Sequence, residues 1–380
     1  MEQKRLGDLA TYINGYAFKP EDRGKEGLPI IRIQDLTGNT YDLGFYNGDY
    51  PEKIEINDGD ILISWSASLG VYIWNRGKAL LNQHIFKVVF DKEEVNKQYF
   101  VFAVKYNLKE MGTKAHGATM KHIVKKDFDN TLVPFPTIEK QDVIAEILSK
   151  AAYIVDARKQ ELQKLDDLVR ARFVELFGDM FLNTMSWNEE PLEEMADVVS
   201  GITKGRKLKA QCTTEVPYMA VSNVKDGYID WTTVKTIEAT EQEINQYRLL
   251  PEDVLMTEGG DPDKLGRGAI IKEPLENCIH QNHIFRVRLN ATVILPEFFA
   301  EYLRHQKSKR YFLGCAKQTT GIASINMRQL KALPVLLPPL ELQNQFADFV
   351  KVVDKSKAAV QKALDQAQLL FDSLMQEYFG

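Results

Sequence analysis

Three stretches of the chain combine basic side chains with small polar ones and contain no acidic residue. Met111–Lys126 holds four lysines and two histidines, and Tyr302–Leu340 holds seven lysines and arginines. The third stretch, Ser200–Cys212, contains the cluster Lys204-Gly205-Arg206-Lys207. Lysine and arginine bind phosphate, and hydroxyl, amide and imidazole groups hydrogen-bond to base edges, so these stretches predict contact with nucleic acid. The alternative is that they are solvated surface loops.

Within these stretches we predict particular DNA contacts. Each of these residues carries a positive charge or a short polar side chain in a loop-like segment: Lys114, His116, Thr119, Lys121, Lys204, Arg206, Lys207, Lys317, Gln318, Thr319 and Thr320. The last two precede Gly321 and could serve only to form a turn, and the lysines could simply be solvated.

One cluster resembles a metal site. Cys278, His280 and His283 lie within six residues, but a structural zinc usually takes four ligands. A half-buried strand edge is therefore the favoured interpretation, and no metal is predicted. His283 and the corresponding His84 both follow an Asn/Gln pair. For these two we favour a structural hydrogen bond to a neighbouring loop over a DNA contact.

Motifs for catalysis are missing from the sequence. There is no G-x-x-x-x-G-K-[ST] and no G-x-G-x-x-G, so no nucleotide-binding loop is predicted. Leu337-Pro338-Pro339-Leu340 lacks the polar first and aromatic last residue expected of an amino-methyltransferase, and Pro262-Asp263 lacks the acidic-x-Lys partner of a metal-dependent nuclease. We therefore expect a chain that is not an enzyme and binds no cofactor. The alternative is an unrecognised methyltransferase or nuclease.

Composition sets the class of protein. The chain has 380 residues, of which 44% are apolar and 27% charged, with a net charge of −5. This is ordinary globular composition for two or three domains. Three cysteines without a C-x-x-C pattern favour a reducing cytosol, and no apolar stretch approaches the roughly 18 residues of a membrane span. A cytoplasmic protein without a membrane segment is expected.

The sequence contains a long internal repeat. Phe135–Gln141 corresponds to Leu337–Gln343 at an offset of 202, and Glu175–Gly178 corresponds to Glu377–Gly380 at the same offset. Upstream the offsets are 193 and 199, so the loops differ in length while the order is kept. A repeat this long indicates two copies of a domain.

Each copy ends in a long helix. Ile138–Phe177 and Leu340–Phe379 contain neither glycine nor proline, and each carries apolar residues at alternating steps of four and three. This 3.5-residue period predicts a coiled-coil seam, and the two seams share one register at an offset of 202. We expect an antiparallel pair related by a rough twofold. The first seam is Ile144, Leu148, Ala151, Val155, Arg158, Leu162, Leu165, Val169, Arg172 and Leu176; the second is Phe346, Val350, Val353, Lys357, Val360, Leu364, Ala367, Phe371, Leu374 and Tyr378.

The rest of each copy predicts a twisted sheet with a few helices, an α+β domain. Short β-rich runs separated by turn residues occur at 28–33, 61–65, 85–90, 216–221, 254–257 and 284–289. Short helices are expected at Lys97–Lys109 and Pro296–Lys309.

The chain resembles the specificity (S) subunits of type I restriction–modification systems over its whole length. The segment Gly321–Leu330 leading into Leu333–Gln343 carries the resemblance, with a weaker copy at Gly117–Met120 and Val133–Gln141. Leu342 and Lys140 precede the glutamines where the family tends to have acidic residues. The resemblance implies target-recognition domains at 1–138 and 179–339, and long helices at 139–178 and 340–380.

The resemblance also implies a role and partners. Each domain would read one half of a split site in double-stranded DNA, while the helices would set the spacing and dock two methyltransferase (M) subunits. S-adenosylmethionine for adenine methylation would bind those partners, and restriction (R) subunits using ATP and magnesium could join. Within the seams, we expect the spacer and partner-binding role to fall on Leu148, Leu162, Leu165, Val350, Leu364 and Phe371. A coiled-coil scaffold joining two protein-binding domains is the alternative, to be distinguished by salt-dependent binding to duplex DNA.

Overall fold

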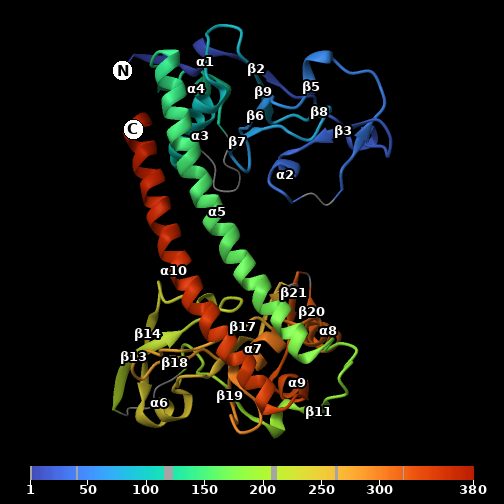
Figure 1. Cartoon of the computed structure of the whole chain (residues 1–380), viewed down its shortest axis with the longest axis vertical. Coiled ribbons are helices and arrows are strands. Elements are labelled where there is room, and N and C mark those ends of the chain that lie inside the picture. Colours follow the sequence, from blue (N-terminus) through green and yellow to red (C-terminus); the bar gives the residue numbers. More distant parts are fainter. Residues whose placement is uncertain (1, 40–41, 115–122, 207–211, 262–263, 320) are drawn as a thin grey trace. The chain divides into compact units, whose positions relative to one another are not determined.

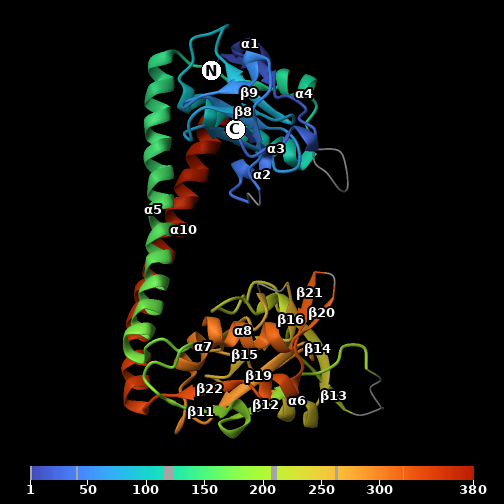
Figure 2. The ribbon, with the colours of Figure 1, turned by 90° about the vertical axis from the view of Figure 1, so that its right-hand side faces the viewer.

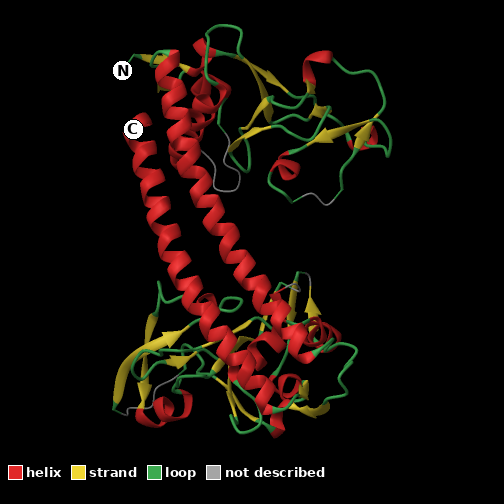
Figure 3. Cartoon of the chain, viewed as in Figure 1, coloured by secondary structure: helices red, strands yellow, loops and turns green. Residues whose placement is uncertain are grey.

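The computed structural model describes residues 2–39, 42–114, 123–206, 212–261, 264–319 and 321–380. The chain forms two compact units, one of Met1–Gln160 with Gln361–Gly380 and the other of Glu161–Val360. Each unit holds one mixed domain of strands and short helices together with part of both long helices (Figures 1 and 3). The α+β class with two repeated domains and two long helices is thus confirmed.

The first domain contains two four-stranded sheets where the sequence predicted one. One sheet is antiparallel with the order β2-β9-β6-β7, and the other has the order β4-β3-β8-β5 with β3 and β8 parallel. Their bounds are β2 Thr11–Asn14, β9 Ile85–Val89, β6 Ile61–Ser64, β7 Gly70–Ile73, β4 Phe45–Tyr46, β3 Leu28–Ile31, β8 Ala79–Leu81 and β5 Glu55–Ile56. The remaining elements are β1 Gln3–Arg5, α1 Leu6–Leu9, η1 Pro20–Asp22, α2 Ile33–Leu36, η2 Glu52–Ile54, α3 Lys97–Lys114, α4 Lys125–Asp129 and β10 Leu132–Pro134.

Strand β6 shows why two sheets form. All four of its residues are buried, and successive side chains point to opposite faces of a strand. Ile61 and Ile63 join the core that includes α3, whereas Leu62 joins a second core with Ile31 and Leu81 of the other sheet. A strand that is buried on both faces has a continuous run of apolar residues in its sequence. This pattern predicts that the strand is buried, but it does not identify the elements that cover each face.

The second domain repeats this arrangement. Its main sheet has the order β12-β19-β15-β17, and β15 sends Val254 and Met256 to one core and Leu255 to another, as β6 does. The strands are β11 Asn188–Pro191, β12 Ala196–Ser200, β13 Thr213–Met219, β14 Lys235–Thr240, β15 Val254–Thr257, β16 Gly259–Gly260, β17 Gly268–Ile270, β18 Ile279–His280, β19 Ile284–Leu289, β20 Lys317–Thr319, β21 Ile322–Ser324 and β22 Pro334–Leu337. The helices are η3 Leu192–Glu194, η4 Val221–Asn223, α6 Glu241–Tyr247, α7 Pro296–Arg304, α8 Gln306–Cys315 and α9 Met327–Lys331.

The short helices differ in extent from their predictions. Helix α3 continues five residues beyond Lys109, to Lys114. The helix expected over Pro296–Lys309 is broken at His305, whose backbone is extended and whose Nδ1 accepts a hydrogen bond from the Lys307 amide at 3.2 Å. His305 therefore caps α8, a local interaction that helical periodicity does not report.

The two long helices are α5 (Ile138–Phe177) and α10 (Leu340–Phe379). In the first unit, Ile144, Leu148 and Val155 of α5 share a core with Phe371 and Met375 of α10. In the second unit, the C-terminal part of α5 shares a core with the N-terminal part of α10, through residues that include Val169, Phe173, Phe346 and Val353. The helices therefore run antiparallel, and every residue of both predicted seams is buried or half-buried.

Charged residues in the second unit's part of the seam are paired within the fold. Lys357 Nζ lies 2.5 Å from Asp166 Oδ1 on the other helix. Asp354, three residues before Lys357 on the same helix, lies 2.5 Å from Lys272 Nζ. Arg172 forms an ion pair of 2.9 Å with Glu175 on its own helix.

The glutamine of the repeated proline-rich segment fastens each long helix to its domain. Gln141 Nε2 donates to the Pro136 carbonyl at 2.9 Å, and its Oε1 accepts from the Asn96 amide at 3.0 Å. Gln343 does the same with Pro338 at 2.8 Å and Leu295 at 2.9 Å. Both side chains are buried, which explains why this glutamine recurs.

Candidate nucleic-acid interface

A small sheet of the second domain presents part of the basic stretch at the surface. Strands β20 and β21 form a hairpin in which Lys317 pairs with Ser324, and β16 adds to β21 through Gly259 and Gly260 (Figure 2). A Cβ on Gly259 would lie 2.8 Å from the Ala323 carbonyl oxygen, so this position requires glycine. Gly321 lies in the hairpin turn with φ +81°, again a glycine conformation. Lys317 is exposed on the outer strand.

Some basic residues of this domain are exposed, and others form ion pairs or ring contacts within the protein. Lys204 is exposed in the turn completed by Gly205. Arg206 is engaged within the domain: its Nε and Nη2 lie 2.6 and 2.8 Å from the two Glu243 carboxylate oxygens. This arginine holds the pKa of Glu243 at about 2, well below its ordinary value. A DNA contact by Arg206 would therefore have to compete with an ion pair, which the sequence did not indicate.

Within the stretch from Tyr302 to Leu340, three further cations also have intramolecular roles. Arg304 Nε lies 3.1 Å from Asp226, Lys307 pairs with Glu189, and Arg310 stacks over the Phe181 ring at 4.4 Å. The stretch contains no acid, but acids from elsewhere in the chain pair with Arg304 and Lys307. Less positive charge is therefore available for a ligand than the sequence of the stretch suggests.

The other predicted contacts are located as follows. Lys114 is the last residue of α3, and Gln318 and Thr319 lie on β20. Five lie outside the described residues: His116, Thr119, Lys121, Lys207 and Thr320. The structure therefore brings Lys317, Gln318 and Thr319 together on one hairpin strand, while Lys204 lies in a separate turn. Contact of these residues with DNA stays a prediction.

The sequence analysis did not identify one position that has the same two backbone hydrogen bonds in both domains. In the second domain, the Glu258 amide donates to the His283 carbonyl at 3.0 Å, and its carbonyl accepts from the Ile325 amide at 2.9 Å. In the first domain, Trp65 forms the same two bonds with His84 at 3.3 Å and Ile123 at 2.9 Å. Both residues directly follow an aligned strand, β15 or β6, and that alignment was the signal that could have identified them.

The two histidines meet different side chains at this position. His283 Nδ1 lies 2.6 Å from Glu258 Oε2, which confirms the expected hydrogen bond to a neighbouring loop. His84 contacts the Trp65 ring edge to face, with ring centroids 4.9 Å apart. The repeat thus keeps the histidine and the hydrogen bond to its carbonyl, while the side chain beside it changes and His84 alone of the two has a positive φ, of 71°.

The metal-like cluster is dispersed by the fold. Cys278 is buried in a core, which raises the pKa of its thiol to about 12. His280 is also buried, and its ring nitrogens lie 3.1 and 3.3 Å from the backbone carbonyls of Tyr247 and Val199. Burial lowers the pKa of His280 to about 4. Over the part of the chain that the structure describes, no three His, Cys, Asp or Glu residues gather as metal ligands.

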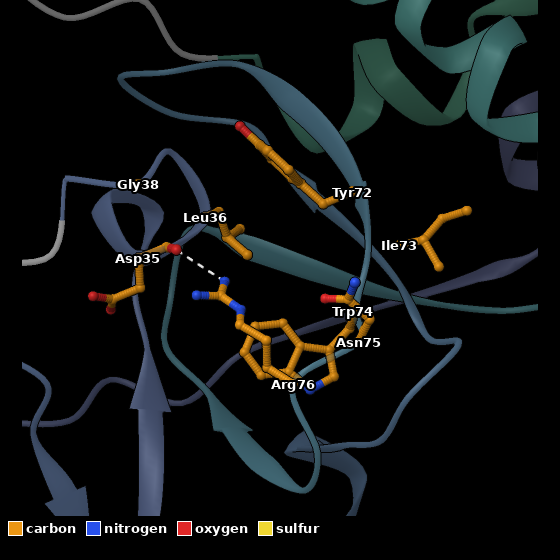
Figure 4. A pocket seen from close by; sticks show the side chains of 8 residues that line it. All are labelled: Asp35, Leu36, Gly38, Tyr72, Ile73, Trp74, Asn75 and Arg76. Carbon is orange, nitrogen blue, oxygen red and sulfur yellow. Dashed lines mark hydrogen bonds between the residues drawn. The ribbon is translucent and has the colours of Figure 1, made fainter. Parts of the chain in front are cut away.

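The first domain has a hollow of about 300 Å³ between α2 and the segment that follows β7. Arg76 lies over the Trp74 ring at 4.4 Å and donates from Nη2 to the Asp35 carbonyl at 2.9 Å (Figure 4). Tyr72 and Leu36 form further parts of the lining, and the Asp35 carboxylate points away from it. The second domain has no equivalent of this stack, because Ile271 and Glu273 occupy the corresponding positions.

The seam residues predicted to bind partners face the interior. Leu148 and Phe371 are buried, and Leu162, Leu165, Val350 and Leu364 are half-buried. Their burial leaves them little surface for another protein, and their spacer and partner-binding role stays a prediction. The exposed apolar residues of the long helices are different ones, among them Val143, Tyr153, Ile154, Leu168, Val352, Leu369 and Leu370. Within the described residues, no helix is both long and apolar enough to cross a membrane.

Comparison with known proteins gives a consistent result. The family model described as type I restriction modification DNA specificity domain matches residues 1–166 and 185–368. The EcoBI specificity subunit of Escherichia coli is 23% identical over 98% of this chain and 83% of its own length. The MjaVIII specificity subunit of Methanocaldococcus jannaschii is 25% identical over 95% of this chain and 89% of its own. The crystal structure of an S subunit from M. genitalium superposes with a TM-score of 0.55 at 16% identity, covering 100% of this chain and 96% of that one.

Proposed function

Because the chain belongs to the family of type I restriction–modification DNA specificity domains, we propose that it is the DNA-reading subunit of such a system. Each domain reads one half of a bipartite target in double-stranded DNA. The observation that carries this proposal is the double match of the family model, once to each copy of a repeated domain followed by a long helix. Two DNA-recognition domains on one chain suit a target with two separate half sequences.

The chain itself is a non-catalytic subunit. We assign the chemistry to its partners: methyltransferase (M) subunits that bind S-adenosylmethionine and methylate adenine, and restriction (R) subunits that use ATP and magnesium. This chain holds no cofactor of its own and acts in the cytoplasm. A solved structure from the type I R-M system, described as the structural basis of complex assembly, superposes with a TM-score of 0.52 and supports assembly of this kind.

The outer faces of the long helices suit two methyltransferase subunits. Tyr153 on α5 is 75% exposed and Leu369 on α10 is 70% exposed, although both lie on helices whose seams are covered. Leu168 and Leu370, separated by 202 residues, are both exposed, so the two copies present one apolar side chain at equivalent places. An exposed apolar side chain at this one repeated position favours two equivalent binding events.

The test is to express the chain with and without its M subunit and map methylated adenines across the host genome. Together they should methylate one bipartite sequence, and the purified chain alone should bind duplex DNA weakly and modify nothing. Methyl transfer by the pure chain would contradict the proposal. Salt-independent association with DNA, and methylation unaffected by this chain, would instead favour a scaffold of protein-binding domains.

The spacer role of the helices has a separate test. Inserting seven residues at equivalent points of both seams restores the 3.5-residue period and lengthens each helix by about 10 Å. We expect a methylated site with the same two half sequences and a gap longer by about three base pairs. Inserting two residues instead should displace the seams and lower the melting temperature. An unchanged gap after a well-folded seven-residue insertion would show that the helices do not measure the distance.

A further inference from the structure

We propose that Glu258, held by His283, is a base-reading residue of the second domain and accepts a hydrogen bond from the exocyclic amino group of a cytosine. This inference rests on the proposed DNA-reading function and names one residue and one base type within it.

The first argument is positional. The backbone of residue 258 is fixed on both sides, by the turn at His283 through its amide and by Ile325 after the β20–β21 hairpin through its carbonyl. Trp65 in the first domain has the same two bonds. A position whose backbone is kept and whose side chain is exchanged between two copies of a reading domain has the property required of a specificity determinant, since the two half sequences need not be equal.

The second argument is the state of the side chain. The Glu258 side chain is 30% exposed, and that of His283 is 56% exposed, so the pair lies at the surface. The 2.6 Å contact from His283 Nδ1 engages one carboxylate oxygen, Oε2, so the other oxygen can serve as the acceptor for a base. A partly exposed side chain that is already held in place loses little conformational entropy when it binds, which favours specific recognition.

The third argument is charge. Glu258 directly precedes β16, which joins the hairpin that carries exposed Lys317. A carboxylate near DNA phosphates is repelled unless a base offers it a donor, and in the major groove glutamate accepts from the N4 amino group of cytosine. Trp65 has no acceptor and cannot make this contact.

The experiment compares Glu258→Ala and Glu258→Gln in the full chain assembled with its M subunit. Methylation is measured on the target and on all its single-base variants, with melting temperatures recorded in parallel. Glu258→Ala should reduce discrimination about tenfold or more at one cytosine-containing position of one half-site and leave the other half-site unchanged. Glu258→Gln keeps an oxygen for His283 but turns an amide N–H₂ outward, so it should disfavour cytosine at that position.

The matched control is Glu276→Ala, which removes an exposed glutamate from the same domain. It should leave base preference unchanged. The inference is overturned if both Glu258 variants methylate the wild-type sequence with wild-type discrimination, or if they lose stability and activity without a change of preference at any position. Failure of the proposed function looks different, because the wild-type chain would then direct no sequence-dependent methylation at all.

Discussion

The two domains keep equivalent hydrogen bonds to the backbone at places where their side chains differ. In the first domain the Arg32 amide donates to Asp35 at 2.8 Å, and in the second the Ala220 amide donates to Asn223 at 2.9 Å. Asn223 also donates to the Asp230 carbonyl at 2.8 Å, whereas Asp35 Oδ1 has no hydrogen-bond partner among the described residues. The comparison teaches that duplication preserved the bonds that set backbone geometry and let the remaining surface of each domain diverge.

The largest expected effect lies where a long helix meets its domain. Phe173 is buried among Phe177, Phe298 and Phe346, and its equivalent 202 residues later is the more flexible Met375. Phe173→Ala should lower the free energy of unfolding by about 3–5 kcal/mol, and Met375→Ala by about 2–5 kcal/mol. Urea denaturation of the full chain measures both. A greater loss for Met375→Ala would show that the first unit depends more on its helix contact.

The repeated glutamines allow a closer comparison. Gln141 satisfies two backbone groups, and Gln343 satisfies three, because it also donates to the Val293 carbonyl at 3.1 Å. Replacing either glutamine by alanine leaves buried backbone groups without hydrogen-bond partners. We expect this to lower the free energy of unfolding by roughly 1–3 kcal/mol in total, with the larger loss for Gln343→Ala. Denaturant midpoints of the two variants decide this order. Equal losses would mean that the third bond contributes nothing.

The sequence predicted the helices and the duplication well because these features repeat. Each long helix has ten seam positions, and the two sets agree at one offset, so the register of the helices is well determined by the sequence. The strand at 254–257 also has the bounds expected. The site was less predictable. The partner of Arg206 is Glu243, 37 residues away, and the neighbour of His283 is Glu258, 25 residues away. Such pairings arise from tertiary structure, and neither periodicity nor local charge reports them.

The hairpin of the second domain offers a test of the predicted phosphate contacts. Lys317→Ala should weaken binding to all DNA sequences about equally and reduce the slope of log affinity against log salt by about one, if this exposed lysine contacts a phosphate. Titrations of the assembled complex at several salt concentrations measure the slope. Lys307→Ala is the control, since Lys307 already pairs with Glu189. Similar slopes for both variants and the wild type would remove Lys317 from the interface.

The smallest expected effect concerns the Arg206–Glu243 pair. Measuring it shows whether Arg206 stabilises the domain or is available for DNA binding. Because the arginine holds the pKa of Glu243 at about 2, the pair contributes stability above the ordinary glutamate pKa and loses it as the pH falls toward 2. At pH 7 Arg206→Ala should cost about 1 kcal/mol, and the difference from wild type should shrink between about pH 4.5 and pH 2. Urea denaturation at a series of pH values measures this, with Arg206→Lys as the variant that keeps the charge but loses the bidentate geometry. Parallel stability curves for wild type and Arg206→Ala would show that the ion pair does not stabilise the domain, leaving the arginine free to serve the DNA surface where the sequence placed it.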